Sequence, residues 1–338
     1  MSKKVLIIGG AGFIGHNLAI KLKKKKFKVL IVDGLEVNNF TSVISNIDNL
    51  PNPKLSKEVL ENRLRLLEKN KIPIKIQDAR DYHALSKIIH NFKPEVLVHL
   101  AAISHSNRSN KNPYSTFDHS LRTLENSLDA ARDNVKHFIF LSSSMVYGNF
   151  KKSEVNENTH CDPLGIYGAL KFSAEKIIIA YNQVFKLPYT IIRPSALYGE
   201  RCISRRVGQI FIENALFDKD IVIDGDGNEK LDFTYIEDLT DGILKIISNV
   251  KSRNEIFNLT FGEGRKIKDL IKILKKFFPN LRVKYKKRDK LMPKRGKLNM
   301  IKAKKLLKFN PKWRLEEGYT NYIKWYLEFY KENLNKFK

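Results

Sequence analysis

The feature that most constrains the fold is a run of glycines between a predicted strand and a predicted helix. The apolar stretch Lys3–Ile8 leads into Gly9-Gly10-Ala11-Gly12-Phe13-Ile14-Gly15, after which Leu18 and Leu22 recur at helical spacing. Glycines allow a tight turn and let backbone N–H groups approach a pyrophosphate at the positive end of the helix dipole. The segment therefore predicts a dinucleotide site whose contacts are Gly9, Gly12, Phe13, Ile14 and Gly15.

The first half of the chain alternates short β-branched runs with helical patterns. We expect strands at 3–8, 28–33, 74–78, 96–100 and 137–142, and a further strand at 189–192 after a long helix at 165–184. The runs are almost wholly apolar, as in a parallel sheet with helices on both faces. This pattern predicts an α/β fold with a Rossmann-type doubly wound parallel sheet.

The second half has a looser rhythm. Short strands are expected near 221–223, 255–259 and 281–285, separated by helices. A polar excursion at 38–71, with a helix around 55–67, interrupts the first half. We therefore predict an NAD-binding domain over 1–190 and a smaller α/β C-terminal lobe, mainly substrate-binding, over 191–338, some of whose segments return to the Rossmann sheet.

An acidic residue at the end of the second strand identifies the cofactor. Asp33 follows Gly15 by 18 residues, where a carboxylate accepts hydrogen bonds from the adenosine ribose and repels a 2′-phosphate. This favours NAD over NADP. Asp78 and Ala79 leave the third strand at the same sheet edge, where Asp78 either reaches the adenine or belongs to a turn that Asp81 closes as a helix N-cap.

A candidate catalytic set follows in chain order. Ser143 ends the fifth strand, and Tyr167 and Lys171 lie four residues apart on one face of the next long helix. A tyrosine is mostly protonated at neutral pH, so a nearby cation is needed to favour its phenolate, and Lys171 supplies it. With Ser143 fixing the reacting hydroxyl, Tyr167 takes the proton while a hydride passes to the nicotinamide.

Composition narrows the remaining possibilities. No apolar run approaches the roughly 20 residues of a membrane helix, and the first strand leaves no room for a signal peptide, so we expect a cytoplasmic protein without membrane contact. Cys161 and Cys202 lack partners at metal-ligand spacing, so no metal site is expected. The net charge of +26 comes from scattered lysines without interleaved aromatics, which favours a solvated surface that steers anionic ligands over a nucleic-acid site.

Further motifs extend the pattern along the chain. They are His99-Leu100-Ala101-Ala102, Arg193-Pro194-Ser195-Ala196-Leu197-Tyr198-Gly199, Asp232-Phe233-Thr234-Tyr235-Ile236-Glu237-Asp238-Leu239 and Leu315-Glu316-Glu317-Gly318. Almost the whole chain resembles the extended short-chain dehydrogenase/reductases, specifically the NAD-dependent nucleotide-sugar epimerase/dehydratase family. The resemblance implies a tightly held NAD, contacted also by Leu100, Ala101 and Ala102, and a nucleoside-diphosphate sugar oxidised at C4. It also implies a homodimer built on helices at 114–132 and 165–184.

Two residues distinguish between reactions of this family. Family dehydratases have Asp and Glu after the serine or threonine, whereas this chain has Ser144 and Met145, which cannot serve as acid and base for water elimination. A 4-epimerase needs no further acid or base, so a UDP-glucose-type 4-epimerase is the leading interpretation. A 4-dehydrogenase that releases the ketosugar, a 4,6-dehydratase, and a non-catalytic NAD-sensing or nucleic-acid-associated protein are the alternatives.

The substrate contacts depart from the family pattern. His119, Ala196 and Leu231 stand where the family has asparagine, asparagine and arginine. Diphosphate binding is therefore assigned to arginines elsewhere, whose guanidinium fork binds phosphate in bidentate fashion, with surface charge as the alternative for each. The predicted substrate contacts are Ser104, His105, Ser143, Ser144, Ala196, Arg205, Arg206 and Arg295; Arg108 either faces the sugar or is a loop residue.

Overall fold

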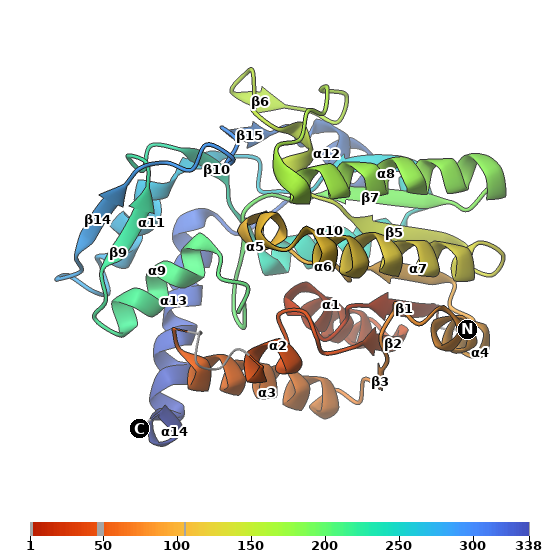
Figure 1. Ribbon diagram of the computed structural model, residues 1–338, viewed down its shortest axis with the longest axis horizontal. Helices are drawn as coiled ribbons and strands as arrows, with labels where there is room; N and C mark the ends of the chain where they lie inside the picture. The colour runs from red at the N-terminus through yellow and green to blue at the C-terminus, as the bar shows by residue number, and fades with distance from the viewer. Residues whose placement is uncertain (1–2, 46–50, 105, 338) are drawn as a thin grey trace.

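A parallel seven-stranded sheet forms the centre of the molecule (Figure 1). The computed structural model describes residues 3–45, 51–104 and 106–337. The sheet order is β12-β7-β5-β4-β1-β2-β3, with β1 (Lys4–Ile8), β2 (Lys28–Asp33), β3 (Ile74–Ile76), β4 (Val96–His99), β5 (His137–Leu141), β7 (Tyr189–Arg193) and β12 (Glu255–Asn258). The predicted doubly wound sheet is confirmed, with boundaries that differ by one or two residues at several ends.

The order of the strands places the ligand site. The chain runs outward from β1 to β2 and β3, then crosses to β4 on the other side of β1. In open α/β sheets a crevice forms outside the carboxyl ends of the strands at such a reversal, because the flanking loops diverge to opposite faces. The glycine loop follows β1 at this point.

Helices cover both faces of the sheet, which explains why its strands are continuously apolar. In β1, Val5 and Ile7 join the buried cluster that includes Leu18 of α1 (Phe13–Lys24) and residues of α10 (Ile236–Ser248). Leu6 and Ile8 join the opposite cluster, which contains residues of α4 (Tyr82–Phe92), α7 (Thr123–Ala131) and α8 (Gly165–Phe185). Alternate side chains of one strand thus fill two separate cores.

The second half of the chain builds smaller units beside the sheet. Strand β9 (Ile221–Asp224) pairs with β14 (Val283–Lys286), β10 (Lys230–Asp232) with β13 (Gly264–Lys266), β8 (Leu197–Tyr198) with β11 (Thr234–Tyr235), and β6 (Glu154–Val155) with β15 (Lys297–Leu298). These pack with α9 (Val207–Leu216), α11 (Ile267–Leu274), α12 (Ile301–Leu307) and α13 (Leu315–Glu332). The domain boundary near residue 190 stays a prediction. In the described part of the chain, no helix is both long and apolar enough to cross a bilayer.

The polar excursion after β2 contains a short helix, α2 (Phe40–Ile44), and a long one, α3 (Pro53–Lys69). Leu55, Val59 and Leu60 of α3 are buried in the same cluster as Leu18 and Leu22 of α1. Helix α3 therefore packs against the helix that follows the glycine loop, and it lies along the lower edge of the molecule in Figure 1.

The prediction of one regular helix over 114–132 is wrong, because a π-helical turn interrupts it. The segment consists of α6 (Pro113–Phe117), a π-helical turn at Asp118–Arg122, and α7. A π turn holds one more residue than an α turn, so it shifts the helical register, and such turns are frequent at functional sites. Here it places His119 at the central cleft described below.

Candidate active site

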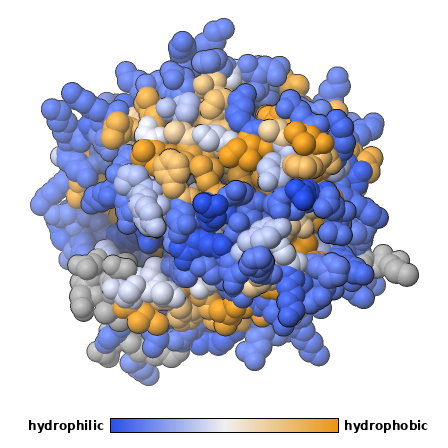
Figure 2. All heavy atoms as spheres, turned by 45° about the vertical axis from the view of Figure 1, so that its right-hand side comes forward, coloured by the Kyte–Doolittle hydropathy of each residue, from blue (hydrophilic) through white to orange (hydrophobic). Residues whose placement is uncertain are grey.

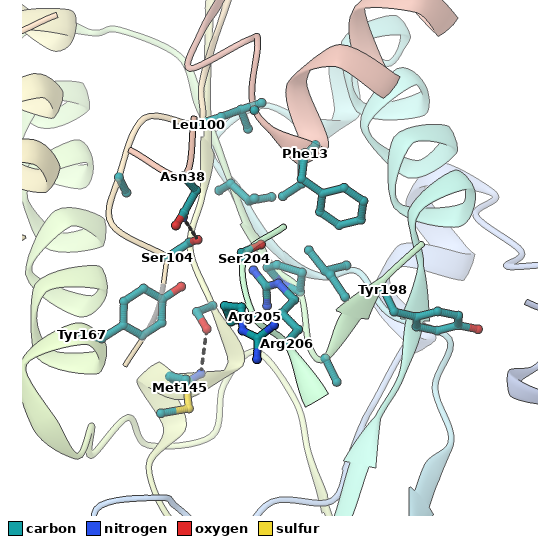
Figure 3. Close-up of a pocket in the computed structure, with 18 of the residues that line it drawn as sticks. Phe13, Asn38, Leu100, Ser104, Met145, Tyr167, Tyr198, Ser204, Arg205 and Arg206 are labelled. Atoms are coloured by element: carbon teal, nitrogen blue, oxygen red, sulfur yellow. Dashed lines mark hydrogen bonds between the residues drawn. The ribbon is translucent and has the colours of Figure 1, made fainter. Parts of the chain in front are cut away.

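A cleft of about 720 Å³ opens at the carboxyl ends of the central strands, between the sheet and the smaller units (Figure 3). Every described residue of the predicted site lines it: Gly9, Gly12, Phe13, Ile14, Gly15, Asp33, Asp78, Ala79, Leu100, Ala101, Ala102, Ser104, Ser143, Ser144, Tyr167, Lys171, Ala196, Arg205, Arg206 and Arg295. His105 lies outside the described residues. Arg108 is exposed on α5 (Ser106–Lys111) and is not one of the described residues that line the cleft. The roles of all these residues stay predictions.

The glycine loop leaves no space for side chains. A Cβ on Gly9, whose φ is +78°, would lie 2.7 Å from the backbone N of Ala101, and one on Gly15 would lie 2.5 Å from the Cα of Gly10. Gly12 is the N-cap of α1 and provides no side-chain cap for its first N–H groups. Backbone donors at a helix N-terminus are thus open to an anion. The cradle fits the pyrophosphate of a dinucleotide.

Asp33 is fixed at the floor of this cradle. Its carboxylate accepts hydrogen bonds from the backbone N–H groups of Ala11 (2.9 Å) and Leu35 (2.8 Å). Burial raises the pKa of Asp33, and these two hydrogen bonds oppose the rise. The side chain is therefore held beside the glycine loop, where a ribose diol is the expected partner.

Asp78 is held by an arginine that the sequence analysis passed over. Arg80 pairs with Asp78 (2.6 Å), Glu36 (2.9 Å) and Asp118 (2.5 Å). Burial raises the pKa of Asp78, but its hydrogen bonds with Arg80 outweigh burial and leave that pKa below its usual value. Asp81 accepts from the N–H of Ala84 and caps α4, so this part of the turn serves the helix.

The catalytic candidates converge on the end of β5. Ser143 begins a 3₁₀ turn at Ser144–Tyr147, where its hydroxyl accepts from the N–H of Met145 at 3.2 Å. Lys171 Nζ donates to the carbonyl of Leu141 at 2.7 Å. Burial raises the pKa of Tyr167, while the charge of Arg206 and a hydrogen bond with Ser143 lower it. The geometry thus places Tyr167 and Ser143 in contact and anchors Lys171 to the same strand end.

Lys171 is a buried cation. Its side chain is 8% exposed, and burial lowers its pKa to about 7, against the opposing effect of the Glu175 carboxylate. Burial thus makes this amine easier to deprotonate than an exposed lysine amine. The Glu175 carboxylate, one helical turn away, favours the protonated form of this amine.

That carboxylate belongs to a buried network. Glu175 accepts from Ser142 Oγ at 2.5 Å and from Arg193 Nε and Nη2 at 3.0 and 2.6 Å. The two charged side chains are 1% and 3% exposed. Glu175 continues the four-residue series of Tyr167 and Lys171 along α8, a spacing visible in the sequence that the analysis did not use. The network ties together β5, α8 and β7, the elements that carry the site.

The predicted phosphate ligands differ in their availability. Arg205 is paired with the buried carboxylate of Glu213 at 2.7 Å. The Nε atoms of Arg206 and Arg295 are buried and lack hydrogen-bond partners among the described residues. Burial, together with the charges of Arg206 and Arg288, lowers the pKa of Arg295 to about 10. In Figure 3, Arg205 and Arg206 enter the hollow opposite Tyr167. Uncompensated positive charge therefore faces the cleft.

The model of the NAD dependent epimerase/dehydratase family matches residues 5–260. The chain belongs to the NAD-dependent epimerase/dehydratase family. Members of this family are enzymes that use NAD on nucleotide sugars, so the predicted family, cofactor and enzymatic nature are confirmed.

Relatives of this chain include UDP-sugar 4-epimerases and a dTDP-D-glucose 4,6-dehydratase of Dictyostelium discoideum. An uncharacterized UDP-glucose epimerase of Bacillus subtilis (strain 168), YtcB, is 30% identical over 328 residues, which are 95% of this chain and 96% of the relative. The UDP-glucuronic acid 4-epimerase of Bacillus cereus, solved with UDP-glucuronic acid and NAD, superimposes with a TM-score of 0.86 at 27% identity, over 97% of this chain and 100% of that one. The UDP-glucose 4-epimerase of Thermotoga maritima, solved with UDP-glucose, gives 0.83 at 27% identity, over 96% and 99%.

The buried network generates the first prediction. Glu175→Gln leaves Arg193 buried without a counter-charge, so the free energy of unfolding should fall by about 3–5 kcal/mol in urea denaturation. Asp218→Asn is the matched control, because Asp218 pairs with Arg282 at the surface with both side chains more than half exposed; its effect should stay below about 1 kcal/mol. Equal effects of the two substitutions would contradict a stabilising role for the network.

Proposed function

We propose that this chain is an NAD-dependent nucleotide-sugar 4-epimerase. The observation that carries the proposal is the turn after Ser143, where the buried residues Ser144 and Met145 offer no carboxylic acid beside the reacting carbon. Elimination of water needs such an acid and base, whereas return of the hydride to the other face of a 4-ketosugar does not. Ser143, Tyr167 and Lys171 suffice for the oxidation and for its reversal.

The protein residues act on one proton in this reaction. NAD held by the glycine loop and Asp33 would supply the hydride acceptor and donor for sugar C4. Ser143 holds the C4 hydroxyl, and Tyr167 removes its proton during oxidation and restores it during reduction. Because burial raises the pKa of Tyr167, the phenolate must be stabilised by a nearby cation. Lys171, supported by Glu175, supplies that charge, and Arg206 adds to it.

The substrate enters from the side of the smaller lobe. Arg206 and Arg295 provide guanidinium groups for the diphosphate of a nucleoside-diphosphate sugar, since their buried Nε atoms have no partners among the described residues. Charge-assisted bidentate contacts of this kind fix the orientation of a phosphate. The Oγ atoms of Ser144 and Ser195 are likewise buried without partners in the described part of the cleft and are offered to sugar hydroxyl or carboxyl oxygens.

A product analysis tests the proposal. The full chain is incubated with UDP-glucose, UDP-glucuronic acid and UDP-N-acetylglucosamine, and products are identified by NMR and mass spectrometry. We expect the C4 epimer of one substrate with no change of mass. Accumulation of a ketosugar with stoichiometric NADH would support a 4-dehydrogenase, the alternative that the departure from the family pattern at Ala196 favours. Loss of water from the substrate would support a dehydratase.

Tyr167→Phe provides the control for this experiment. The variant lacks the proton acceptor, so turnover should fall by about 100-fold or more, while the NAD content of the purified protein stays unchanged. Tyr285→Phe, at a tyrosine that is 57% exposed on β14, should behave like the unaltered protein. Full turnover by Tyr167→Phe would overturn the mechanism.

The proposed phosphate ligands generate a separate prediction. Arg206→Met and Arg295→Met should each raise the KM for the nucleotide sugar by about ten-fold or more, because a charged hydrogen bond in a desolvated site is lost. Binding of NAD should not change. Arg282→Met, at a side chain that is 55% exposed, is the control. An unchanged KM in both variants would place the diphosphate elsewhere.

We further propose a homodimer through α6, α7 and α8. Tyr114 is 85% exposed and Val184 is 68% exposed, and the face turned forward in Figure 2 carries hydrophobic residues in a band among hydrophilic ones. A contiguous exposed apolar patch, rather than a single exposed apolar side chain, marks a protein contact. Tyr114→Glu combined with Val184→Glu should convert the dimer into a monomer in sedimentation equilibrium, whereas Val250→Glu, at a valine 70% exposed elsewhere, should not. A wild-type monomer would refute the dimer.

A further inference from the structure

Arg63 of α3 is a buried arginine to which the proposed reaction assigns no role. Its side chain is 1% exposed, and it lines the central cleft. Nε donates to the carbonyl oxygen of Arg201 at 2.9 Å, and Nη2 donates to the same oxygen. Nη1 is buried without a hydrogen-bond partner, and no ion pair found among the described residues includes Arg63. Burial of a guanidinium without an anion in contact costs folding free energy, unless a bound ligand supplies the anion.

The positive charge of Arg63 acts on two titratable groups beside the cofactor cradle. After burial, the charge of Arg63 is the next cause that lowers the pKa of His16, in the first turns of α1. The same charge helps to lower the pKa of Asp33, which burial raises. The Asp33 carboxylate accepts two backbone N–H groups, and Nη1 of Arg63 has no hydrogen-bond partner among the described residues. Helix α3 packs against α1, and Arg63 lines the same cleft as Asp33 at the end of β2 and Gly12 at the start of α1.

The cation remains charged under physiological conditions. Burial lowers the pKa of Arg63 to about 10, which is still far above neutrality. NAD carries its negative charge on the diphosphate, and the glycine cradle places that group at the N-terminus of α1.

We propose that Arg63 binds the diphosphate of NAD through its free Nη1 and so completes the glycine cradle from the α3 side. The inference rests on NAD binding, which the family establishes, and not on the epimerase reaction. Backbone N–H groups provide neutral donors, whereas Arg63 adds a charge-assisted hydrogen bond.

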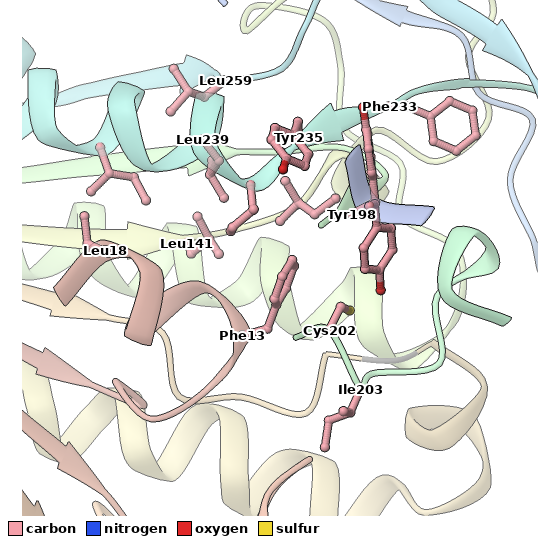
Figure 4. Close-up of a cluster of buried hydrophobic side chains, with 14 of the residues drawn as sticks. Phe13, Leu18, Leu141, Tyr198, Cys202, Ile203, Phe233, Tyr235, Leu239 and Leu259 are labelled. Carbon is pink, nitrogen blue, oxygen red and sulfur yellow. The ribbon is translucent and has the colours of Figure 1, made fainter. Parts of the chain in front are cut away.

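The same side chain joins the cofactor site to the substrate segment. Arg201, which accepts from Arg63, precedes Arg205 and Arg206 on the loop between β8 and α9, and its own Nε donates to Asn62 Oδ1 at 2.7 Å. Cys202, next along this loop, belongs to the buried cluster that contains Phe13 of the cradle (Figure 4). Arg63 therefore holds the loop with two of its N–H groups and offers the third nitrogen to the cofactor, so that binding of NAD stabilises the loop with the substrate arginines.

Ligand truncation combined with substitution tests this contact. Nucleotide-free full chain is titrated calorimetrically with NAD, ADP-ribose and adenosine. Arg63→Met should weaken NAD and ADP-ribose by about ten-fold or more and leave adenosine unchanged, since adenosine lacks the diphosphate. Arg65→Met, on the same helix but 51% exposed, should bind all three ligands normally. Equal weakening of ADP-ribose and adenosine, or no weakening of either, would overturn the proposal.

A second variant tests the proposal even if Arg63→Met does not fold. Arg63→Lys keeps the charge and most of the volume but cannot bridge the Arg201 carbonyl and a phosphate at once. Its thermal unfolding in the absence of ligand should stay cooperative, and its Kd for ADP-ribose should rise several-fold while that for adenosine does not. Normal ADP-ribose binding by this variant would count against the proposal even if Arg63→Met fails to fold. Catalytic activity enters neither measurement, so failure here is separable from failure of the epimerase assignment.

Discussion

The close approach of the glycine loop to the end of β4 is the constraint on which the rest of the structure depends. A Cβ on Gly9 would lie within 3.0 Å of the backbone of Ala101, so only glycine lets β1 and β4 diverge from such a short contact. This divergence is the reversal point of the sheet, and it opens the cleft between Asp33 on one side and Ser143 on the other. The Gly9 contact shapes the cofactor cradle, and the strand order brings the catalytic strand end to the same edge of the sheet.

The buried charges divide into two groups. Glu175 and Arg193 satisfy each other and hold the catalytic elements in register, while Glu175 supports the charge of Lys171. Arg63, Arg206 and Arg295 instead keep buried nitrogen atoms without partners in the described part of the chain, and all three line the cleft. The Glu175–Arg193 pair is fully satisfied, whereas, among the described residues, the three cleft arginines have nitrogen atoms free to donate, which suits them to bind anions. The two diphosphates of NAD and a nucleotide sugar fit that requirement.

Much of the site could be predicted because its residues follow strands in regular order. Once the apolar runs are assigned to parallel strands, residues such as Asp33 and Ser143 must meet at one sheet edge, and four-residue spacing must put Tyr167 and Lys171 on one helix face. The π-helical turn that brings His119 to the cleft could not be predicted in this way, because a single inserted residue leaves no periodic signal. Arg63 was missed for a related reason, since it lies on a helix outside the alternating pattern.

The sequence by itself determined the fold class and the cofactor, and it predicted a catalytic set, because these depend on local spacing and on the order of strands along the chain. Only the tertiary structure decided which charges are neutralised. Arg205 and Arg206 are neighbours in sequence, yet Arg205 pairs with Glu213 while the Nε of Arg206 stays unpartnered among the described residues. Whether a guanidinium is available to a ligand depends on burial and on distant carboxylates, and these are properties of packing between segments that no local pattern contains.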